Sequence, residues 1–132
     1  MRVLVDTSVW SLSLRAAGPV DHPAVEKLTS LLRADEDLFL IGLILQEILQ
    51  AFRSDSSFHK VAKHLEPFVL LELEREDFVA AASLHRKCAA RGVSASTVDC
   101  LIAHAAIRHG CLLLSADKDF ERIARFSELK LV

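Results

Sequence analysis

The chain lacks most of the patterns that would assign it to several common protein classes. It has only four glycines and neither a G-x-G-x-x-G nor a Walker sequence, so it offers no glycine loop to cradle a nucleotide. No run approaches the roughly 18 apolar residues that a membrane span needs. The first residues lack the basic head and small-residue cleavage site of a signal peptide. We therefore predict a cytoplasmic protein without a membrane span or a nucleotide cofactor.

Cysteines, histidines and basic residues are not arranged in the ways that usually carry chemistry. Cys88, Cys100 and Cys111 form no C-x-x-C pair, so we expect reduced thiols in the core. The six histidines include no H-E-x-x-H sequence, and Ser8 lacks the G-x-S-x-G context of a serine hydrolase. The formal net charge of −2 provides no general basic surface for nucleic acid. Nucleic-acid binding would therefore require acids gathered in one place and basic residues in another.

What the chain does have is a hydrophobic content of 52% over 132 residues, enough for one core, and we treat 1–132 as a single domain. Short buried runs alternate with segments of helical periodicity. Strands are predicted over 2–6, 38–41, 68–71 and 111–114, with an edge strand over 129–132. Helices are predicted from 9, over 21–33, from 42, and over 58–65, 76–91, 96–110 and 118–126. The alternation predicts a three-layer α/β fold, in which a mainly parallel sheet of four to five strands has helices on both faces.

Four acids fall where such a fold places its ligand. Asp6 and Asp117 follow the first and fourth buried strands, and open α/β sheets form their ligand crevice at that end of the strands. Asp99 opens the helix before the fourth strand, so a right-handed crossover brings it to the same edge, which Glu47 can also reach. Carboxylates within about 4–6 Å repel one another and raise each other's pKa, so their cluster is stable only with a cation or shared protons, and a divalent cation is the simpler explanation. The pattern therefore predicts a site for Mg²⁺ or Mn²⁺, which take oxygen ligands.

Each of these acids also has an ordinary structural interpretation. Asp99 completes a capping-box spacing with Ser96, and Asp117 can cap the short helix that follows it. Glu47 can be a solvated residue on an amphipathic helix. Asp6 has the least ordinary position, because a bare charge buried at the end of a central strand must be paired, capped or bound to a metal.

A metal centre at this edge suits phosphodiester cleavage, because a metal-activated water can attack phosphorus. Thr7 and Ser115 are placed to orient the ligands, whereas Asp119 is expected to face a different direction on its short helix. Basic residues near helix ends are predicted to hold a phosphate backbone, although such residues also stabilise the helix dipole. They are Arg86, Lys87, Arg91, Arg108, Lys118, Arg122 and Arg125.

Taken together, the motifs resemble those of PIN-domain ribonucleases over nearly the whole chain. They are Val-Leu-Val-Asp6-Thr7-Ser8-Val-Trp near the start, Glu47 in its helix, Ser-Thr-Val-Asp99-Cys-Leu-Ile-Ala, and Leu-Leu-Leu-Ser-Ala-Asp117-Lys-Asp-Phe near the end. The resemblance implies that Asp6, Glu47, Asp99 and Asp117 are the catalytic acids, and that Asp6, Asp99 and Asp117 hold Mg²⁺ or Mn²⁺. It implies supporting roles for Thr7, Ser8, Ser115 and Asp119.

The chain length points to the VapC toxins within that family. The resemblance then implies a homodimer, a higher assembly with a cognate VapB-type antitoxin whose tail occupies the acidic groove, and RNA as the substrate. Two positions depart from the usual pattern. Ser115 stands where threonine is commoner, and Gly42-Leu43 lacks the hydroxyl residue often found before the glutamate helix.

Other classes fit the motifs less well. A phosphotransfer enzyme of the haloacid-dehalogenase type needs a second aspartate two residues after Asp6, where this chain has Ser8, and a receiver domain needs an acidic pair after its first strand. The remaining alternative is a PIN-like fold without catalysis that serves as an RNA- or protein-binding module. The presence of all four acids favours the enzyme. Which RNA is cut depends on groove shape and loop contacts, which the sequence does not reveal.

Overall fold

A parallel sheet forms the centre of the molecule. The computed structural model describes residues 1–15 and 20–132, and its strands lie in the order β3-β2-β1-β4. Their bounds are β1 Arg2–Val5, β2 Asp37–Ile41, β3 Val69–Leu71 and β4 Leu112–Leu114. β1 pairs with both β2 and β4, and Val3, Leu4 and Val5 are fully buried, as expected for a strand covered on both faces. The predicted α/β class with a parallel sheet is confirmed.

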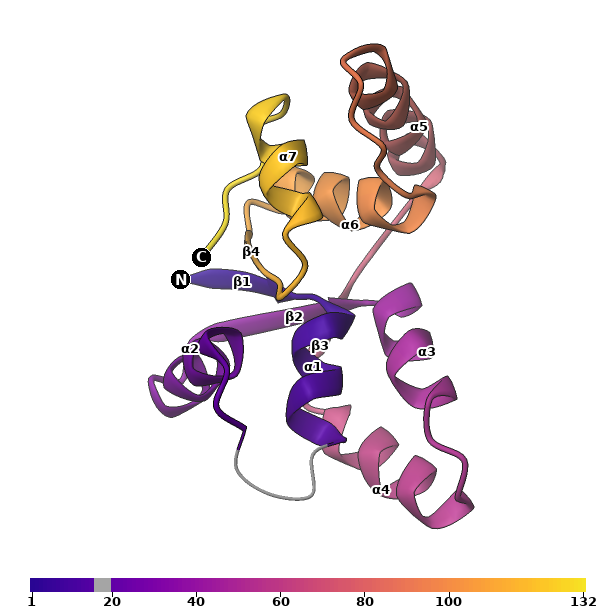
Figure 1. Cartoon of the computed structure of the whole chain (residues 1–132). Coiled ribbons are helices and arrows are strands. Elements are labelled where there is room, and N and C mark those ends of the chain that lie inside the picture. The colour runs from indigo at the N-terminus through magenta and orange to yellow at the C-terminus, as the bar shows by residue number, and fades with distance from the viewer. Residues whose placement is uncertain (16–19) are drawn as a thin grey trace.

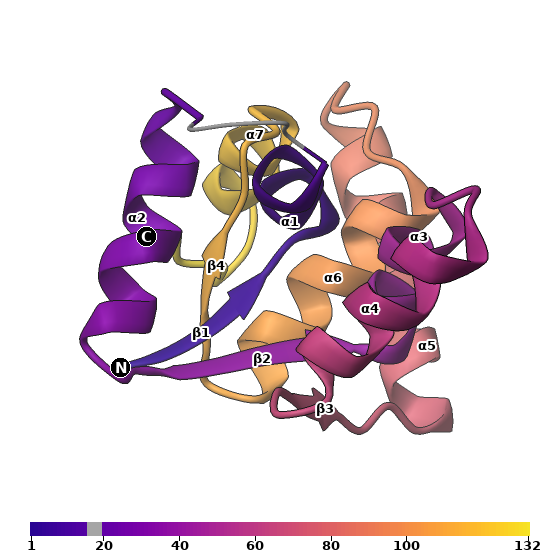
Figure 2. The same ribbon diagram turned by 90° about the horizontal axis from the view of Figure 1, so that it is seen from below.

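Helices cover both faces of this sheet (Figures 1 and 2). One face carries α1 (Thr7–Leu14), α2 (Pro23–Arg33), α3 (Gly42–Gln50) and α4 (Asp55–Leu65). The other carries α5 (Arg75–Ala90), α6 (Thr97–Arg108) and α7 (Asp119–Arg125). The chain therefore leaves β1 toward one face and reaches β4 from the other. The connections diverge between these neighbouring strands, which is the switch point where open α/β sheets place their ligand crevice.

Most predicted elements agree with the structure to within two residues at each end, and two differ further. α4 begins at Asp55 rather than at 58, because the Ser54 side chain accepts a hydrogen bond from the Ser57 backbone N–H and caps the helix within the predicted polar turn. The predicted edge strand over 129–132 is wrong. It is reduced to a bridge between Leu113 and Leu131, although Val132 N–H still donates to the Leu113 carbonyl at 3.0 Å.

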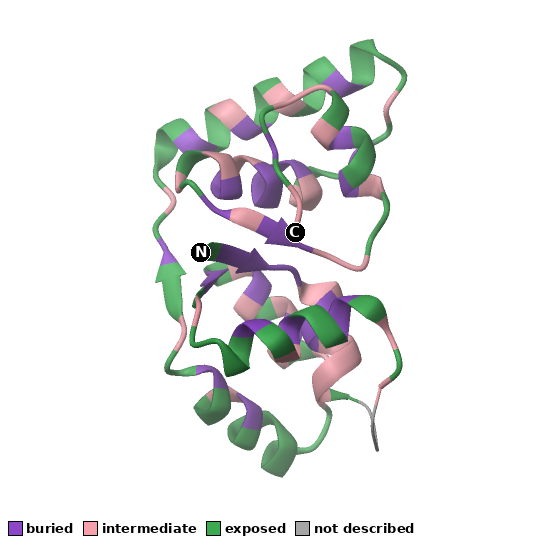
Figure 3. Ribbon diagram, turned by 90° about the vertical axis from the view of Figure 1, so that its left-hand side faces the viewer, coloured by how far each residue is buried: buried purple, intermediate pink, exposed green. Residues whose placement is uncertain are grey.

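The core fills the space between the sheet and its helices, and the outward helix faces are exposed (Figure 3). Trp10 and Phe120 are its largest fully buried side chains. Cys88, Cys100 and Cys111 are buried and free, as predicted, and burial raises the pKa of the Cys100 thiol to about 11. Among the described residues, no helix has the length and apolar character to cross a membrane.

A buried ionic network joins α5 to α6. Asp77, only 3% exposed, accepts hydrogen bonds from the Glu74 backbone N–H at 2.7 Å and shares one with His104 Nε2 at 2.8 Å. Arg108 donates both to the Asp77 carboxylate and to the Glu72 carbonyl. The Arg108 side chain thus ties α6 to the start of α5, although its position near a helix end had suggested contact with phosphate.

Candidate active site

Asp6 lies at the carboxyl end of β1, where the chain turns into α1. Its side chain is 6% exposed, and its Oδ2 accepts hydrogen bonds from Ser8 Oγ at 2.6 Å and Ser115 Oγ at 2.9 Å. The same oxygen caps α1 through the Ser8 backbone N–H at 3.4 Å. One carboxylate oxygen therefore takes all three bonds, and the orientation of the group is set by Ser8 of α1 and by Ser115, which follows β4.

The serine hydroxyls also shape the turn that follows β4. Ser8 Oγ accepts from the Ala116 backbone N–H at 3.0 Å, and Ser115 Oγ accepts from the Asp117 backbone N–H at 3.0 Å. Asp117 Oδ1 in turn accepts from the Asp119 backbone N–H at 2.9 Å. The ends of two neighbouring strands are thus joined by short polar side chains, and this explains why serines stand at both strand ends.

Three carboxylates converge beside Asp6. Asp99, Asp117 and Asp119 each offer an oxygen, and these atoms all lie within 4.8 Å of one another. Asp99 reaches this point from the first turn of α6, which Ser96 caps by accepting from the Asp99 backbone N–H at 3.0 Å. The expectation that Asp119 faces a different direction does not hold. It is the first residue of α7, and the tight turn at Asp117 brings its side chain back toward the group.

The charges of this group act on one another. Burial raises the pKa of Asp99, and the negative charges of Asp117, Asp6 and Asp119 raise it further, against a hydrogen bond with Ser96 that lowers it. Asp6 thus lies close enough to take part in the same electrostatic cluster. Repelling carboxylates gathered at a switch point are typical of a cation site.

Glu47 is held by a contact of its own, with Thr7. It sits on α3, half-buried, and its Oε1 accepts a hydrogen bond from Thr7 Oγ1 at 3.0 Å. It is therefore tied to the first residue after Asp6 and is not one of the three residues within 4.8 Å of one another. Thr7, predicted to orient the metal ligands, makes its side-chain hydrogen bond to Glu47.

The predicted basic residues are spread over different surroundings. Arg122 forms an exposed ion pair with Asp119 at 3.4 Å, and Lys118 directly follows Asp117. Arg91 instead lies over the Phe126 ring at 5.0 Å. Arg86 borders an apolar cleft between α5 and α6, and Lys87 is exposed on α5. Lys118 and Arg122 are thus the members of this set that adjoin the acids.

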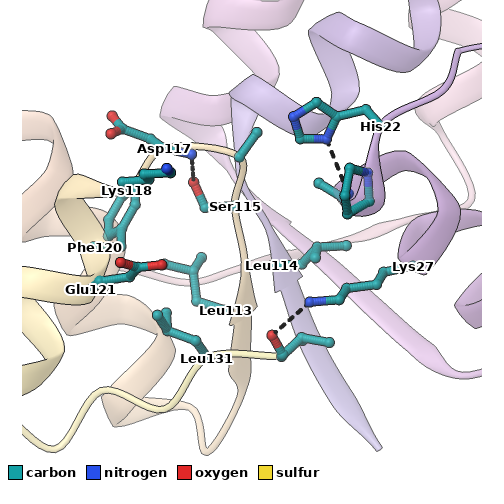
Figure 4. A pocket seen from close by; sticks show the side chains of 14 residues that line it. His22, Lys27, Leu113, Leu114, Ser115, Asp117, Lys118, Phe120, Glu121 and Leu131 are labelled. Carbon is teal, nitrogen blue, oxygen red and sulfur yellow. Dashed lines mark hydrogen bonds between the residues drawn. The ribbon is translucent and has the colours of Figure 1, made fainter.

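Two basic side chains near the acids had no signal in the sequence. His22, just before α2, and Lys27, on α2, line a pocket that also includes Asp117 (Figure 4). They are about ninety residues away from Asp117 along the chain, and no motif or periodicity connects them with it.

Comparison with known proteins agrees with this geometry. A family model described as PIN domain matches residues 3–126. The chain belongs to the PIN domain family. Its strand-end aspartates and its helix-opening Asp99 lie within the matched range, so the recognised pattern and the converging carboxylates belong to the same PIN domain.

Named relatives place this PIN domain close to VapC proteins. It is 32% identical to VapC ribonuclease Mb1587 of Mycobacterium bovis and to ribonuclease VapC11 of Mycobacterium tuberculosis, over 97% of this chain and 96% of each relative. Solved structures share its fold at lower identity. VapBC2 of Rickettsia felis, bound to a promoter DNA fragment, has a TM-score of 0.78 at 14% identity, covering 100% of this chain and 98% of that one. FitAcB of Neisseria gonorrhoeae has a TM-score of 0.71 at 18% identity, covering 98% and 95%.

Proposed function

We propose that this PIN domain is a metal-dependent endoribonuclease, the VapC toxin of a toxin–antitoxin pair, that hydrolyses RNA phosphodiester bonds. The observation that carries the proposal is the convergence of Asp99, Asp117 and Asp119 at the switch point of the sheet, close enough to Asp6 for its charge to act on Asp99. Relatives named as VapC ribonucleases over nearly the full chain support the substrate class. The cytoplasm stays the predicted compartment, since its RNA and antitoxin would be found there.

The donor set fits a hard divalent cation. Its side chains offer carboxylate oxygens, with serine hydroxyls behind Asp6, and the described residues place no lysine or arginine ion pair on Asp6, Asp99 or Asp117. Mg²⁺ and Mn²⁺ prefer such oxygen ligands and leave positions open for water and phosphate oxygens. Asp6, Asp99 and Asp117 would hold the ion, and the position of Asp119 makes it a further candidate ligand.

The chain's own groups then have separate tasks. A divalent ion bound here would activate a water and neutralise charge on the phosphodiester. Ser8 and Ser115 occupy one oxygen of Asp6, so its other oxygen would be available to the ion. Thr7 holds Glu47 Oε1, which leaves Oε2 to orient the attacking water or accept its proton. Lys118 and Arg122 lie beside the acids and could contact phosphate oxygens of the RNA.

We infer a VapB-type antitoxin as the protein partner, with a homodimer as the toxin unit. The neighbouring solved structures are named as VapBC and FitAB assemblies, which supports a two-component system. An antitoxin that places a cationic side chain among Asp99, Asp117 and Asp119 would compete with the metal ion for the same carboxylates.

Loss of the Ser8 hydroxyl should weaken metal binding without unfolding the protein. Ser8→Ala removes a 2.6 Å hydrogen bond to Asp6 and leaves the Ala116 backbone N–H without that acceptor. Residues that orient metal ligands typically change affinity by about 10- to 100-fold, and we expect a loss of that size for Mn²⁺ in calorimetric titration. Ser13→Ala, later on the same helix, is the matched control. Equal Mn²⁺ affinity in both variants would show that Ser8 does not contribute to metal binding.

The experiment that tests the proposed function is cleavage of a mixed cellular RNA pool by the chain purified without antitoxin. Cleavage should require Mg²⁺ or Mn²⁺, stop with excess chelator, and resume when the metal is restored. Sequencing of the new RNA ends would identify the preferred substrate. RNA that is bound but left uncut under all metal conditions would instead support the non-catalytic binding module.

A further inference from the structure

A pocket of about 310 Å³ opens directly beside the acidic group, between α2 and the turn from β4 to α7 (Figure 4). It shares Ser115, Ala116 and Asp117 with the candidate active site, so the two are continuous. Its volume is at the lower end of that of small-molecule sites, which suits a single nucleoside-sized group.

The two walls of this pocket differ in charge. His22 and Lys27 project from the α2 wall, whereas Glu121 and Asp117 lie on the opposite wall with Lys118 and Phe120 (Figure 4). An anionic group entering the pocket is therefore attracted to the α2 side and repelled by the carboxylates opposite. The floor between the walls is apolar and includes Leu113, Leu114 and Leu131.

Both groups on the α2 wall are positioned as donors. His22 Nδ1 accepts a hydrogen bond from the Ala24 backbone N–H at 3.1 Å, which requires an unprotonated Nδ1 and leaves the proton on Nε2. Lys27 Nζ donates a 3.3 Å hydrogen bond to the main-chain oxygen of Val132. This bond is long, and an incoming phosphate would offer Lys27 further charged oxygen acceptors at a shorter distance.

We propose that this pocket binds one unpaired nucleotide of the RNA, adjacent to the phosphodiester that is cut. Its base lies on the apolar floor beside Leu131, and its phosphate meets Lys27 and His22. Proteins read single-stranded RNA by splaying out bases in this way, whereas a base inside a duplex cannot enter such a pocket. The inference rests on the proposed function for the position of the cut strand, because the acids and the pocket share the Ser115–Asp117 turn.

Binding of nucleoside 5′-monophosphates, measured by NMR chemical shifts in excess chelator, tests the pocket without metal or cleavage. We expect the shifts to cluster at Ala24, Ser115 and Phe120. Inorganic phosphate should bind at least about tenfold more weakly because it lacks the base. Lys27→Glu should weaken nucleotide binding by at least about tenfold and Lys27→Arg should retain most of it. Lys130→Glu makes the same charge change at a separate pocket near Gly110 and should have no effect.

The outcomes separate this inference from the proposed function. Equal binding of nucleotides by the Lys27→Glu and Lys130→Glu variants, shifts confined to other surfaces, or phosphate binding as tight as nucleotide binding would each overturn the pocket even if RNA is cleaved. In cleavage assays of the normal chain, RNA with an abasic nucleotide next to the cut should have a higher KM than intact RNA and nearly the same kcat. For the Lys27→Glu variant, the KM values of the two RNAs should be equal. Nucleotide binding without any metal-dependent cleavage would support the nucleotide pocket and contradict the proposed ribonuclease activity.

Discussion

Replacing Asp6 by asparagine should lower the rate of RNA cleavage by roughly 100- to 1000-fold, because it removes the charge of a buried ligand while preserving its shape. The asparagine oxygen can still accept from Ser8 and Ser115, whose hydroxyls hold the present carboxylate at 2.6 and 2.9 Å. The loss would therefore come from weaker metal binding and charge neutralisation rather than from a displaced side chain. The rate should be measured at saturating metal and RNA, beside Asp55→Asn as a control in an exposed acid of α4.

The same substitution should leave the metal-free protein as stable as the normal chain, or more stable. Asp6 is one of the charges that raise the pKa of Asp99, so its neutralisation relieves repulsion within the cluster. Thermal unfolding in chelator should show this, and added Mn²⁺ should raise Tm less for the variant than for the normal chain. Undiminished cleavage by Asp6→Asn would exclude Asp6 as a ligand. A large fall in the metal-free Tm would show that its role is structural.

Asp77→Asn should destabilise the fold by roughly 1.5–3 kcal/mol without touching the acidic group, because it weakens hydrogen bonds that a buried charged acceptor makes. Asp77 joins His104 and Arg108 of α6 to the start of α5. Arg108 is partly exposed and can be resolvated by water, so the loss should stay below that of a fully buried ion pair. Chemical denaturation measures the difference, and Glu76→Gln, an exposed neighbour on the same turn, should change stability by well under 1 kcal/mol.

The effect of Asp77 should also depend on pH in a defined direction. Burial acts to raise its pKa, but the Glu74 N–H, His104 and Arg108 outweigh burial and hold the pKa below its ordinary value of 3.8. A carboxyl with a lowered folded pKa contributes stability that is complete above the unfolded value and is lost as the pH falls through the folded one. The stability gap between the normal chain and Asp77→Asn should therefore be constant near neutral pH and narrow below about pH 3.8. A gap that widens on acidification would contradict this assignment.

Local signals predicted the framework of the site well. Asp6 and Asp117 follow short, mainly apolar strands, and parallel strands bring such ends to one edge of the sheet. Ser96 marks the start of α6 and thereby places Asp99 on its first turn. Gly92 and Gly110 end α5 and α6 in the left-handed conformation that glycine adopts without strain.

Features that depend on the directions of side chains were less accessible. Asp119 joins the carboxylates because the turn at Asp117 is tight, and the sequence does not reveal that geometry. The Asp77, His104 and Arg108 network joins residues 27 and 31 positions apart with no periodic relation. The segment 129–132 pairs with β4 only through a single bridge at Leu113, and apolar residues alone do not reveal how far such pairing extends.

Local patterns were enough to predict the order and type of the elements, apart from the segment 129–132, and the acids that end or open them, because strand patterning and helix capping depend on neighbouring residues. Which side chains lie close together depended instead on how the elements pack. The tertiary structure placed Lys27 and His22 across a pocket from Asp117, and it drew Asp119 into the acidic group. The packing of helices on the two faces of the sheet sets such distances, and that packing depends on contacts between residues that no local pattern connects.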